Sequence, residues 1–434
     1  MAYNLDLHIE KSFERLSSDT YSIEKIWQKD DYDWQGDWEG RALLAFVCLY
    51  EVTGKKIPCM DKMLEELPAH LNEKGYMGVV LNGVADEQQL SGHSWFLRGL
   101  CEYYNVFKSE KSLGFARGIV ENLYLPLVGL YDKYPLERKA SDEGGVSGNS
   151  GETTDDWKLS TDIGCAYMCL DGLSAYYEIT RDDRVKTAIN RLIDGFMRLD
   201  RIKMRCQTHA TLSATRGIVG MYLATGEKDY LEKAVSVYEF YLKHGMTLTY
   251  ENFNWFGRKN TWTEPCAVVD SFILAVRFYE ITKKREYKTL ASRILYNGLS
   301  FCHRANGGAG PNACVTKTQP YLSVSMYEAP FCCTMRYCEG LKFARLFEKD
   351  LLRDGDDKNV AADSPNNVSV ASDDISVDEY GRVFKGDEML AIDENNAFPD
   401  AEKILVNGKK YIGIPAFIGT ENADAKLKVC DEKR

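Results

Sequence analysis

The chain has 434 residues, of which 44% are hydrophobic and 27% charged, and its formal net charge is −11. This composition supports one large globular domain with room for a small second one. The acidic balance argues against nucleic acid or an anionic membrane as the main partner. No apolar run approaches the roughly 18 residues of a membrane span, and the first residues do not resemble a secretory signal. Thirteen cysteines, an odd number, favour free thiols and a cytoplasmic protein.

A recurring helical unit fills the first 350 residues. Each copy is an apolar helix with an aromatic residue near its end, followed by a short polar turn and a second helix. The helices end near 49–53, 101–104, 175–180, 221–225, 277–282 and, in weaker form, 344–348. Repeated helical hairpins bury their apolar faces on their neighbours. Six uneven copies predict a closed (α/α)6 barrel over residues 1–350, with an open solenoid as the alternative, and irregular loops such as 141–154 at its mouth.

The pattern changes after the barrel. Residues 351–367 are rich in Asp and Asn and predict a linker. Residues 368–434 contain short alternating apolar runs, and Asn407-Gly408 lies between two of them as a hairpin signal. We therefore expect a small β-rich region at 368–434.

The most unusual motif combines Glu264-Pro265-Cys266 with the adjacent pair Cys332-Cys333. Three thiolates and a carboxylate suit one tetrahedral Zn²⁺ ion. Pro265 favours an extended Glu264, so that Glu264 and Cys266 point to the same side just before a helix. Adjacent cysteines do not easily form a disulfide with each other. The alternative is that these cysteines pack as small buried hydrophobic residues.

Polar and aromatic segments supply candidate substrate ligands that we expect at one end of the barrel. These candidates are Asp37, His93, His209, Trp255 and Trp262. Asp37 could instead be a helix N-cap, and a lone histidine such as His93, expected just before a helix, is more often structural. Together they suit a small-molecule pocket.

The motifs resemble glycoside hydrolase family 127, the β-L-arabinofuranosidase family. That family has an (α/α)6 barrel followed by β domains, which are longer than the β region expected here. The resemblance implies a zinc ion bound by Glu264, Cys266, Cys332 and Cys333, with Cys332 as the nucleophile. Glu251, in Glu-Asn-Phe (251–253), matches the family's acid/base motif. The 295–298 and 225–230 segments, and the contexts of His93 and His209, also resemble the family.

The resemblance implies a retaining, zinc-thiolate glycosidase acting on a small glycoside or oligosaccharide. Cys332 would form a thioglycosyl intermediate, and Glu251 would protonate the leaving oxygen and then activate water. Two alternatives remain open. One is a sugar epimerase or an unsaturated-uronide hydrolase on the same barrel. The other is a non-catalytic scaffold in which a structural zinc supports carbohydrate binding.

Overall fold

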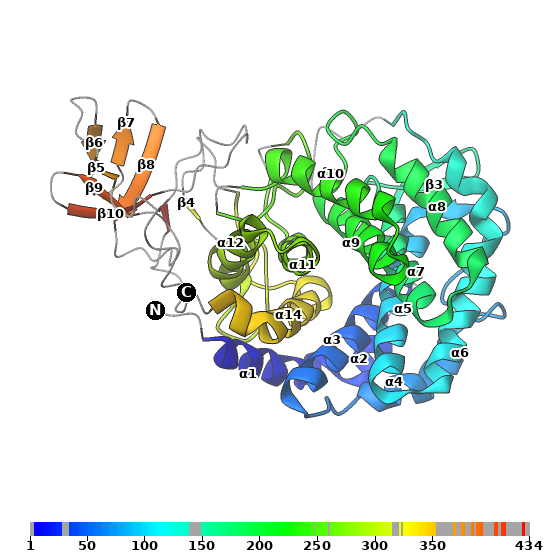
Figure 1. Cartoon of the computed structure of the whole chain (residues 1–434). Coiled ribbons are helices and arrows are strands. Elements are labelled where there is room, and N and C mark those ends of the chain that lie inside the picture. The colour runs from blue at the N-terminus through cyan, green and yellow to red at the C-terminus, as the bar shows by residue number, and fades with distance from the viewer. Residues whose placement is uncertain are drawn as a thin grey trace.

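The computed structural model describes residues 4–27, 34–138, 149–247, 249–258, 261–314, 321–322 and 324–352, and short strands between 368 and 429. Within these residues, six long helices form a closed inner ring in which each contacts the next and the last contacts the first (Figure 1). They are α3 (Asp37–Thr53), α5 (Glu87–Phe107), α7 (Cys169–Thr180), α9 (Thr208–Thr225), α11 (Pro265–Thr282) and α14 (Met335–Leu352). The chain therefore folds as the expected (α/α)6 barrel, not as an open solenoid.

A second layer of helices surrounds the ring. It consists of α1 (Leu5–Leu16), α4 (Met60–Glu66), α6 (Glu110–Ile119), α8 (Asp183–Met197), α10 (Lys228–His244) and α12 (Arg285–Arg293). Between successive inner helices the chain returns along an outer helix, so the inner helices all begin at the same end of the barrel. We call this end the N-terminal mouth. The short helices α2 (Ile23–Ile26) and α13 (Ser300–Cys302) lie in connections.

Five of the inner helices end in the same way. Gly54, Lys108, Arg181, Gly226 and Lys283 each follow an inner helix with a positive φ between 54° and 76°. In each case the backbone N–H of this residue bonds to a carbonyl of the last helical turn, which stops the helix and redirects the chain. The polar turns recognised in the sequence are these helix ends.

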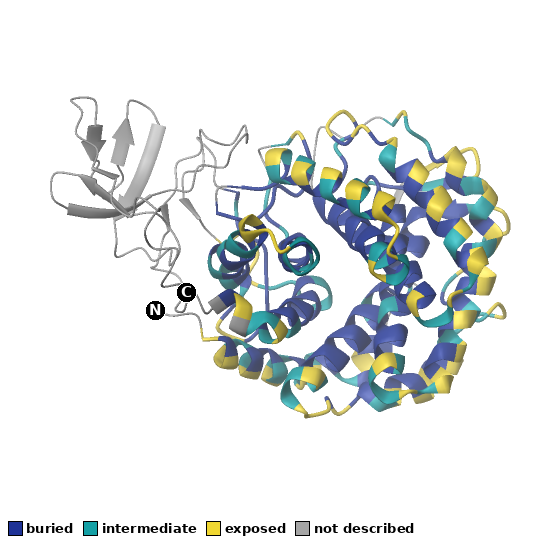
Figure 2. Ribbon diagram, in the orientation of Figure 1, coloured by how far each residue is buried: buried dark blue, intermediate teal, exposed yellow. Residues whose placement is uncertain are grey.

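Burial follows the two layers, with buried residues lining the ring and exposed residues on its outside (Figure 2). The outer helix α8 buries Val185, Ile189, Leu192 and Phe196, whose spacing of three or four residues places them on one face. The inner helices pack closely through glycine. A Cβ on Gly40 of α3 would lie 2.1 Å from the backbone of α5, so no larger residue fits there without movement.

A small sheet joins the segment before α5 to the connection between α6 and α7. Strands β1 (Ala85–Asp86), β3 (Trp157–Ser160) and β2 (Asn149–Thr154) pair in that order. Part of the segment 141–154, expected as an irregular loop, is therefore strand β2. None of the described helices is long and apolar enough to cross a membrane.

The C-terminal region contains the expected strands. The sheet has the order β5-β9-β10-β8-β7-β6. Its strands are β5 (Val368–Ser369), β6 (Ile375–Val377), β7 (Val383–Lys385), β8 (Glu388–Asp393), β9 (Lys403–Val406) and β10 (Lys409–Gly413), and a separate short strand, β11 (Lys428–Val429), pairs with β4 (Tyr321–Leu322). Val406 pairs with Lys409, so Asn407-Gly408 connects two antiparallel strands, as expected. The predicted linker lies almost entirely outside the described residues, and the domain boundaries remain predictions.

Candidate functional site

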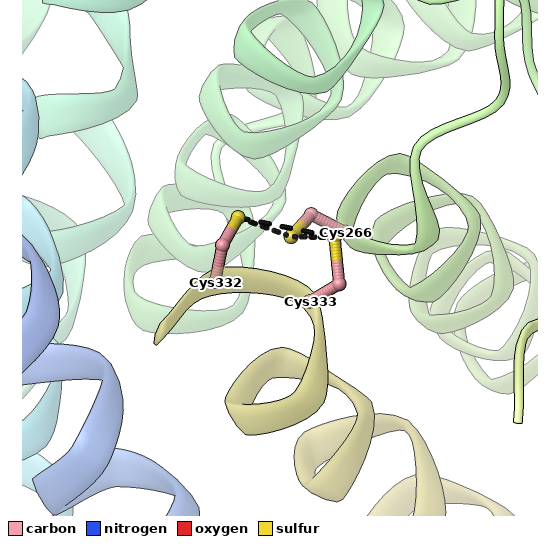
Figure 3. A group of neighbouring side chains, drawn as sticks. All are labelled: Cys266, Cys332 and Cys333. Carbon is pink, nitrogen blue, oxygen red and sulfur yellow. Dashed lines mark hydrogen bonds between the residues drawn. The ribbon is translucent and has the colours of Figure 1, made fainter. Parts of the chain in front are cut away.

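The thiols of Cys266, Cys332 and Cys333 converge at the N-terminal mouth (Figure 3). Cys266 is the second residue of α11, and Cys332 and Cys333 lie in the π-helical turn Pro330–Thr334 that leads into α14. The Sγ atom of Cys266 is 3.3 Å from that of Cys332 and 3.7 Å from that of Cys333, and the two adjacent cysteines are 3.9 Å apart. The twelve cysteines among the described residues are free thiols.

These distances fit a metal ion bound by sulfur. In a tetrahedral site with Zn–S bonds of about 2.3 Å, neighbouring sulfur atoms lie about 3.8 Å apart. Cys266 and Cys333 are buried, whereas Cys332 is partly exposed. The cluster therefore offers a preformed set of sulfur ligands, and Cys332 is the member that a small molecule could reach.

The surroundings of Cys332 favour its thiolate. Hydrogen bonds from Cys266 and Cys333 hold the pKa of Cys332 well below its ordinary value, and nearby Arg41 and His209 act in the same direction against the effect of burial. Burial and the hydrogen bonds to its neighbours raise the pKa of Cys266. Arg41 Nη1 also donates to Cys266 Sγ at 3.6 Å. Among the three thiols, the surroundings therefore favour the thiolate form most at Cys332.

Glu264 belongs to a second, overlapping group. As expected, it has extended backbone geometry and directly precedes α11. Its carboxylate faces His209, with Oε1 3.2 Å from His209 Nδ1. The ligand atoms of His209, Glu264 and Cys266 lie within 4.8 Å of one another, as do those of Cys266, Cys332 and Cys333. The four expected zinc ligands are thus divided between two groups that share Cys266.

Asp37 lies at the same mouth as the first residue of α3. The N-cap of that helix is Gly36, so the N-cap alternative for Asp37 is wrong. Arg41 Nε donates to Asp37 Oδ2 at 2.8 Å, while Oδ1 is buried and has no hydrogen-bond partner. Burial raises the pKa of Asp37 to about 6, Arg41 opposes this effect, and the charge of Cys332 adds to it. Asp37 therefore offers a free, protonatable oxygen close to Cys332.

Glu251 has different surroundings. It is fully buried, and its Oε1 accepts a 2.6 Å hydrogen bond from Asn312 and a 3.3 Å bond from Thr263, while Oε2 accepts one from Thr249 at 3.1 Å. Burial raises its pKa to about 7 although these bonds oppose the shift. That value suits an acid/base, but both oxygens of the buried carboxyl group are already held by hydrogen bonds within the protein. The geometry therefore favours a structural role over the expected catalytic one.

His93 also has an internal role. The segment 91–95 lies within α5 and not before a helix. His93 is completely buried, its Nε2 accepts from the backbone N–H of Met77 at 3.0 Å, and its Nδ1 lies 2.9 Å from the carbonyl of Gln89. Both ring nitrogens are thus used by backbone groups. The structure therefore does not support His93 as a substrate ligand.

Aromatic residues flank the cluster. Trp262, partly exposed, comes two residues before Glu264 and contacts buried Trp255 edge to face, with ring centroids 5.2 Å apart. Trp38 stacks on Phe331, the residue before Cys332, at a centroid distance of 4.4 Å. Sequence reasoning named the tryptophan pair and missed the stacked pair. Stacked aromatic surfaces of this kind pack well against the apolar face of a sugar ring.

A buried network of ion pairs lies among the inner helices. It contains Arg98, Asp171, Arg216, Asp270, Arg336 and Glu339, which come from five inner helices. Asp270 lies 2.7 Å from Arg216 and 2.5 Å from Arg336. Burial would raise the pKa of Asp270, but these two guanidinium groups outweigh it and hold the pKa below its ordinary range. These ion pairs link side chains from five inner helices inside the ring.

Sequence reasoning missed two supporting residues of the mouth. Trp95 lies between cations, with Arg41 4.3 Å and Arg336 4.4 Å from its ring centroid, and it also stacks on His209. The spacing of Asp37 and Arg41 on one helix, four residues apart, is a signal that could have indicated their ion pair. Nothing in the sequence indicates that Arg41 reaches Cys266 on another helix.

Comparison with known proteins gives the fold. No protein-family profile and no curated protein sequence matches the chain. A family 127 β-arabinofuranosidase superposes with a TM-score of 0.50 at 14% identity, over 77% of this chain and 55% of that one. An unsaturated glucuronyl hydrolase specific for heparin gives 0.52 at 14% identity, over 80% and 98%. A family 76 α-mannanase from Bacteroides thetaiotaomicron gives 0.51 at 10% identity, over 80% and 98%.

At these identities the likeness shows the shared (α/α)6 barrel and no particular activity. The chain spans little more than half the length of the family 127 enzyme.

Proposed function

We propose that the protein is a retaining glycosidase that uses Cys332 as its nucleophile within a zinc-thiolate centre. One observation carries the proposal: the thiols of Cys266, Cys332 and Cys333 meet at tetrahedral spacing at the mouth of the barrel, and Cys332 is the partly exposed one. The barrel fold, which carbohydrate-processing enzymes among the structural neighbours share, supports a sugar substrate. The motif resemblance supports a β-L-arabinofuranoside-like glycoside.

Glu264, Cys266, Cys332 and Cys333 are the residues that would hold the zinc ion. When bound, the ion would keep Cys332 deprotonated near neutral pH. The Cys332 Sγ atom attacks the anomeric carbon and forms a C–S bond while the C–O bond to the leaving group breaks. A water molecule then attacks the same carbon, the C–S bond breaks, and Cys332 is regenerated as a thiolate.

An acid/base must give a proton to the leaving oxygen and then take one from water. We assign this role to Asp37 in place of Glu251. The free Oδ1 of Asp37 is close to Cys332, and Arg41 fixes the other carboxyl oxygen. Trp38, Phe331 and Trp262 would pack against the sugar.

Hydrolysis of a panel of nitrophenyl glycosides that includes β-L-arabinofuranoside tests the proposal. We expect activity on at least one furanoside or pyranoside, together with about one zinc ion per chain in fully reduced protein, because the four ligands suit one ion. Cys332→Ala should abolish that activity. The proposal fails if the reduced wild-type protein binds no zinc, or if Cys332→Ala retains full activity.

A further inference from the structure

Two candidate ligand groups meet at one sulfur atom. Cys266, Cys332 and Cys333 form the first, and His209, Glu264 and Cys266 form the second. A metal ion held by the first group therefore lies beside the second, because Cys266 Sγ belongs to both. Of the five residues, the sequence motif accounts for four. His209 is the one that the expected zinc site leaves without a role toward the metal.

His209 lies between two carboxylates. It is the second residue of α9 and is only 1% exposed, which leaves almost no surface for a sugar hydroxyl. Its Nδ1 faces Glu264, and its Nε2 lies 3.4 Å from Asp270 Oδ2 on the other side of the ring. A carboxylate near the second ring nitrogen is the usual neighbour of a histidine that ligates a metal, although His209 Nε2 makes no hydrogen bond to Asp270 here. Stacking on Trp95, with centroids 5.6 Å apart and planes at 18°, fixes the ring.

Asp270 is well suited to this supporting position. Ser213 donates to its Oδ2 at 2.6 Å, and Arg216 and Arg336 bind its Oδ1. The carboxylate is completely buried and is held by partners on two other inner helices, α9 and α14. These partners hold the carboxylate in place independently of the thiols.

The proposed reaction creates a need for such a ligand. A site closed by four protein ligands is usually structural, whereas catalytic zinc sites keep an exchangeable position. Once Cys332 has bonded to the anomeric carbon, its sulfur is no longer a thiolate and donates poorly. We propose that His209 is an alternate zinc ligand that takes the coordination position vacated by Cys332, so that Glu264, Cys266, Cys333 and His209 hold the ion in the intermediate. This inference rests on the proposed function and deepens it.

X-ray absorption at the zinc edge tests the exchange without any substrate. We expect three sulfur ligands in the zinc-loaded wild-type protein. In Cys332→Ser we expect two sulfur ligands and the multiple-scattering signal of an imidazole. A second version of the experiment uses the wild-type protein and so avoids any folding defect of the variant. Iodoacetamide, applied to folded zinc-loaded protein, should alkylate the partly exposed Cys332 and produce the same change in zinc ligands. Peptide mass mapping would confirm the site of alkylation.

Zinc affinity, measured by chelator competition, gives an independent readout. His209→Gln should change the affinity little while Cys332 is present, but should lower it roughly 10- to 100-fold in the Cys332→Ser background. His93→Gln is the matched control. It removes a buried imidazole of the same barrel whose ring nitrogens bond only to backbone groups, and it should show no such dependence on Cys332.

The possible failures can be told apart. If the wild-type protein binds no zinc, the proposed function itself is wrong. If the wild-type site holds three sulfur ligands but no imidazole appears after Cys332 is lost or alkylated, only the ligand exchange is wrong. An equal effect of His209→Gln with and without Cys332 would also overturn it, because it would show a role independent of that thiol.

Discussion

Replacing Glu251 by glutamine should separate a structural role from a catalytic one. The buried carboxyl group has its pKa raised from 4.5 to about 7, chiefly by burial. A raised pKa means that the folded state holds the proton more tightly than the unfolded state between these two values. The free energy of unfolding is therefore highest below pH 4.5 and falls as pH rises to about 7. Between pH values below 4.5 and above 7, the free energy of unfolding decreases by about 3 kcal/mol, since each tenfold change in proton affinity is worth about 1.4 kcal/mol.

Glu251→Gln removes this titration, and the amide can still accept from Asn312 and donate to a threonine hydroxyl. Urea unfolding of zinc-loaded protein between pH 5 and pH 8 should show the variant gaining stability relative to wild type, by about 2.5 kcal/mol over that range. Glu232→Gln, at an exposed position on α10, controls for the loss of one charge. Activity should survive the Glu251 change. A parallel pH dependence in wild type and variant, or a loss of activity of about 100-fold or more, as expected for a missing general acid, would refute the reasoning.

Two further substitutions test the mouth and the buried network of ion pairs. Asp37→Asn should slow the hydrolysis of alkyl glycosides by about 10²–10⁴-fold and that of nitrophenyl glycosides less. Added azide should restore turnover of the variant, with a glycosyl azide as the product. Unchanged rates, or azide rescue only in Glu251→Gln, would exclude Asp37 as the acid/base. Asp270→Asn should lower the free energy of unfolding by about 3–5 kcal/mol, because Arg216 and Arg336 lose a buried counter-charge; a change below about 1 kcal/mol in urea unfolding would show that the network compensates.

Much of the fold could be predicted from the sequence because its signals are local. The inner helices end in similar aromatic and polar segments, and these segments coincide with the left-handed residues that stop the helices, such as Gly54 and Gly226. The Asn407-Gly408 hairpin is likewise a two-residue signal. Strand β2 was missed because it lies in a segment rich in Gly and Ser, residues that favour loops.

The candidate site was only partly predictable. The spacing of the cysteines and the resemblance to family 127 indicated the three clustered thiols, because the ligands lie in two short motifs, Glu-Pro-Cys and Cys-Cys. The environment of Glu251 depends on Asn312 and Thr263 from other segments, so sequence proximity to the zinc motif did not indicate its burial. The same holds for Arg41, which reaches Cys266 only because α3 and α11 begin at the same mouth. Contacts between distant helices carry no local pattern.

The identity of the residue that bonds to the sugar tests the central claim most directly. Reduced, zinc-loaded protein would be mixed with a nitrophenyl glycoside that it hydrolyses, quenched in acid during turnover and digested for peptide mass mapping. The account predicts a glycosyl adduct on Cys332, with Cys266 and Cys333 unmodified. An adduct on a carboxylate, or on either of the other two cysteines, would contradict it.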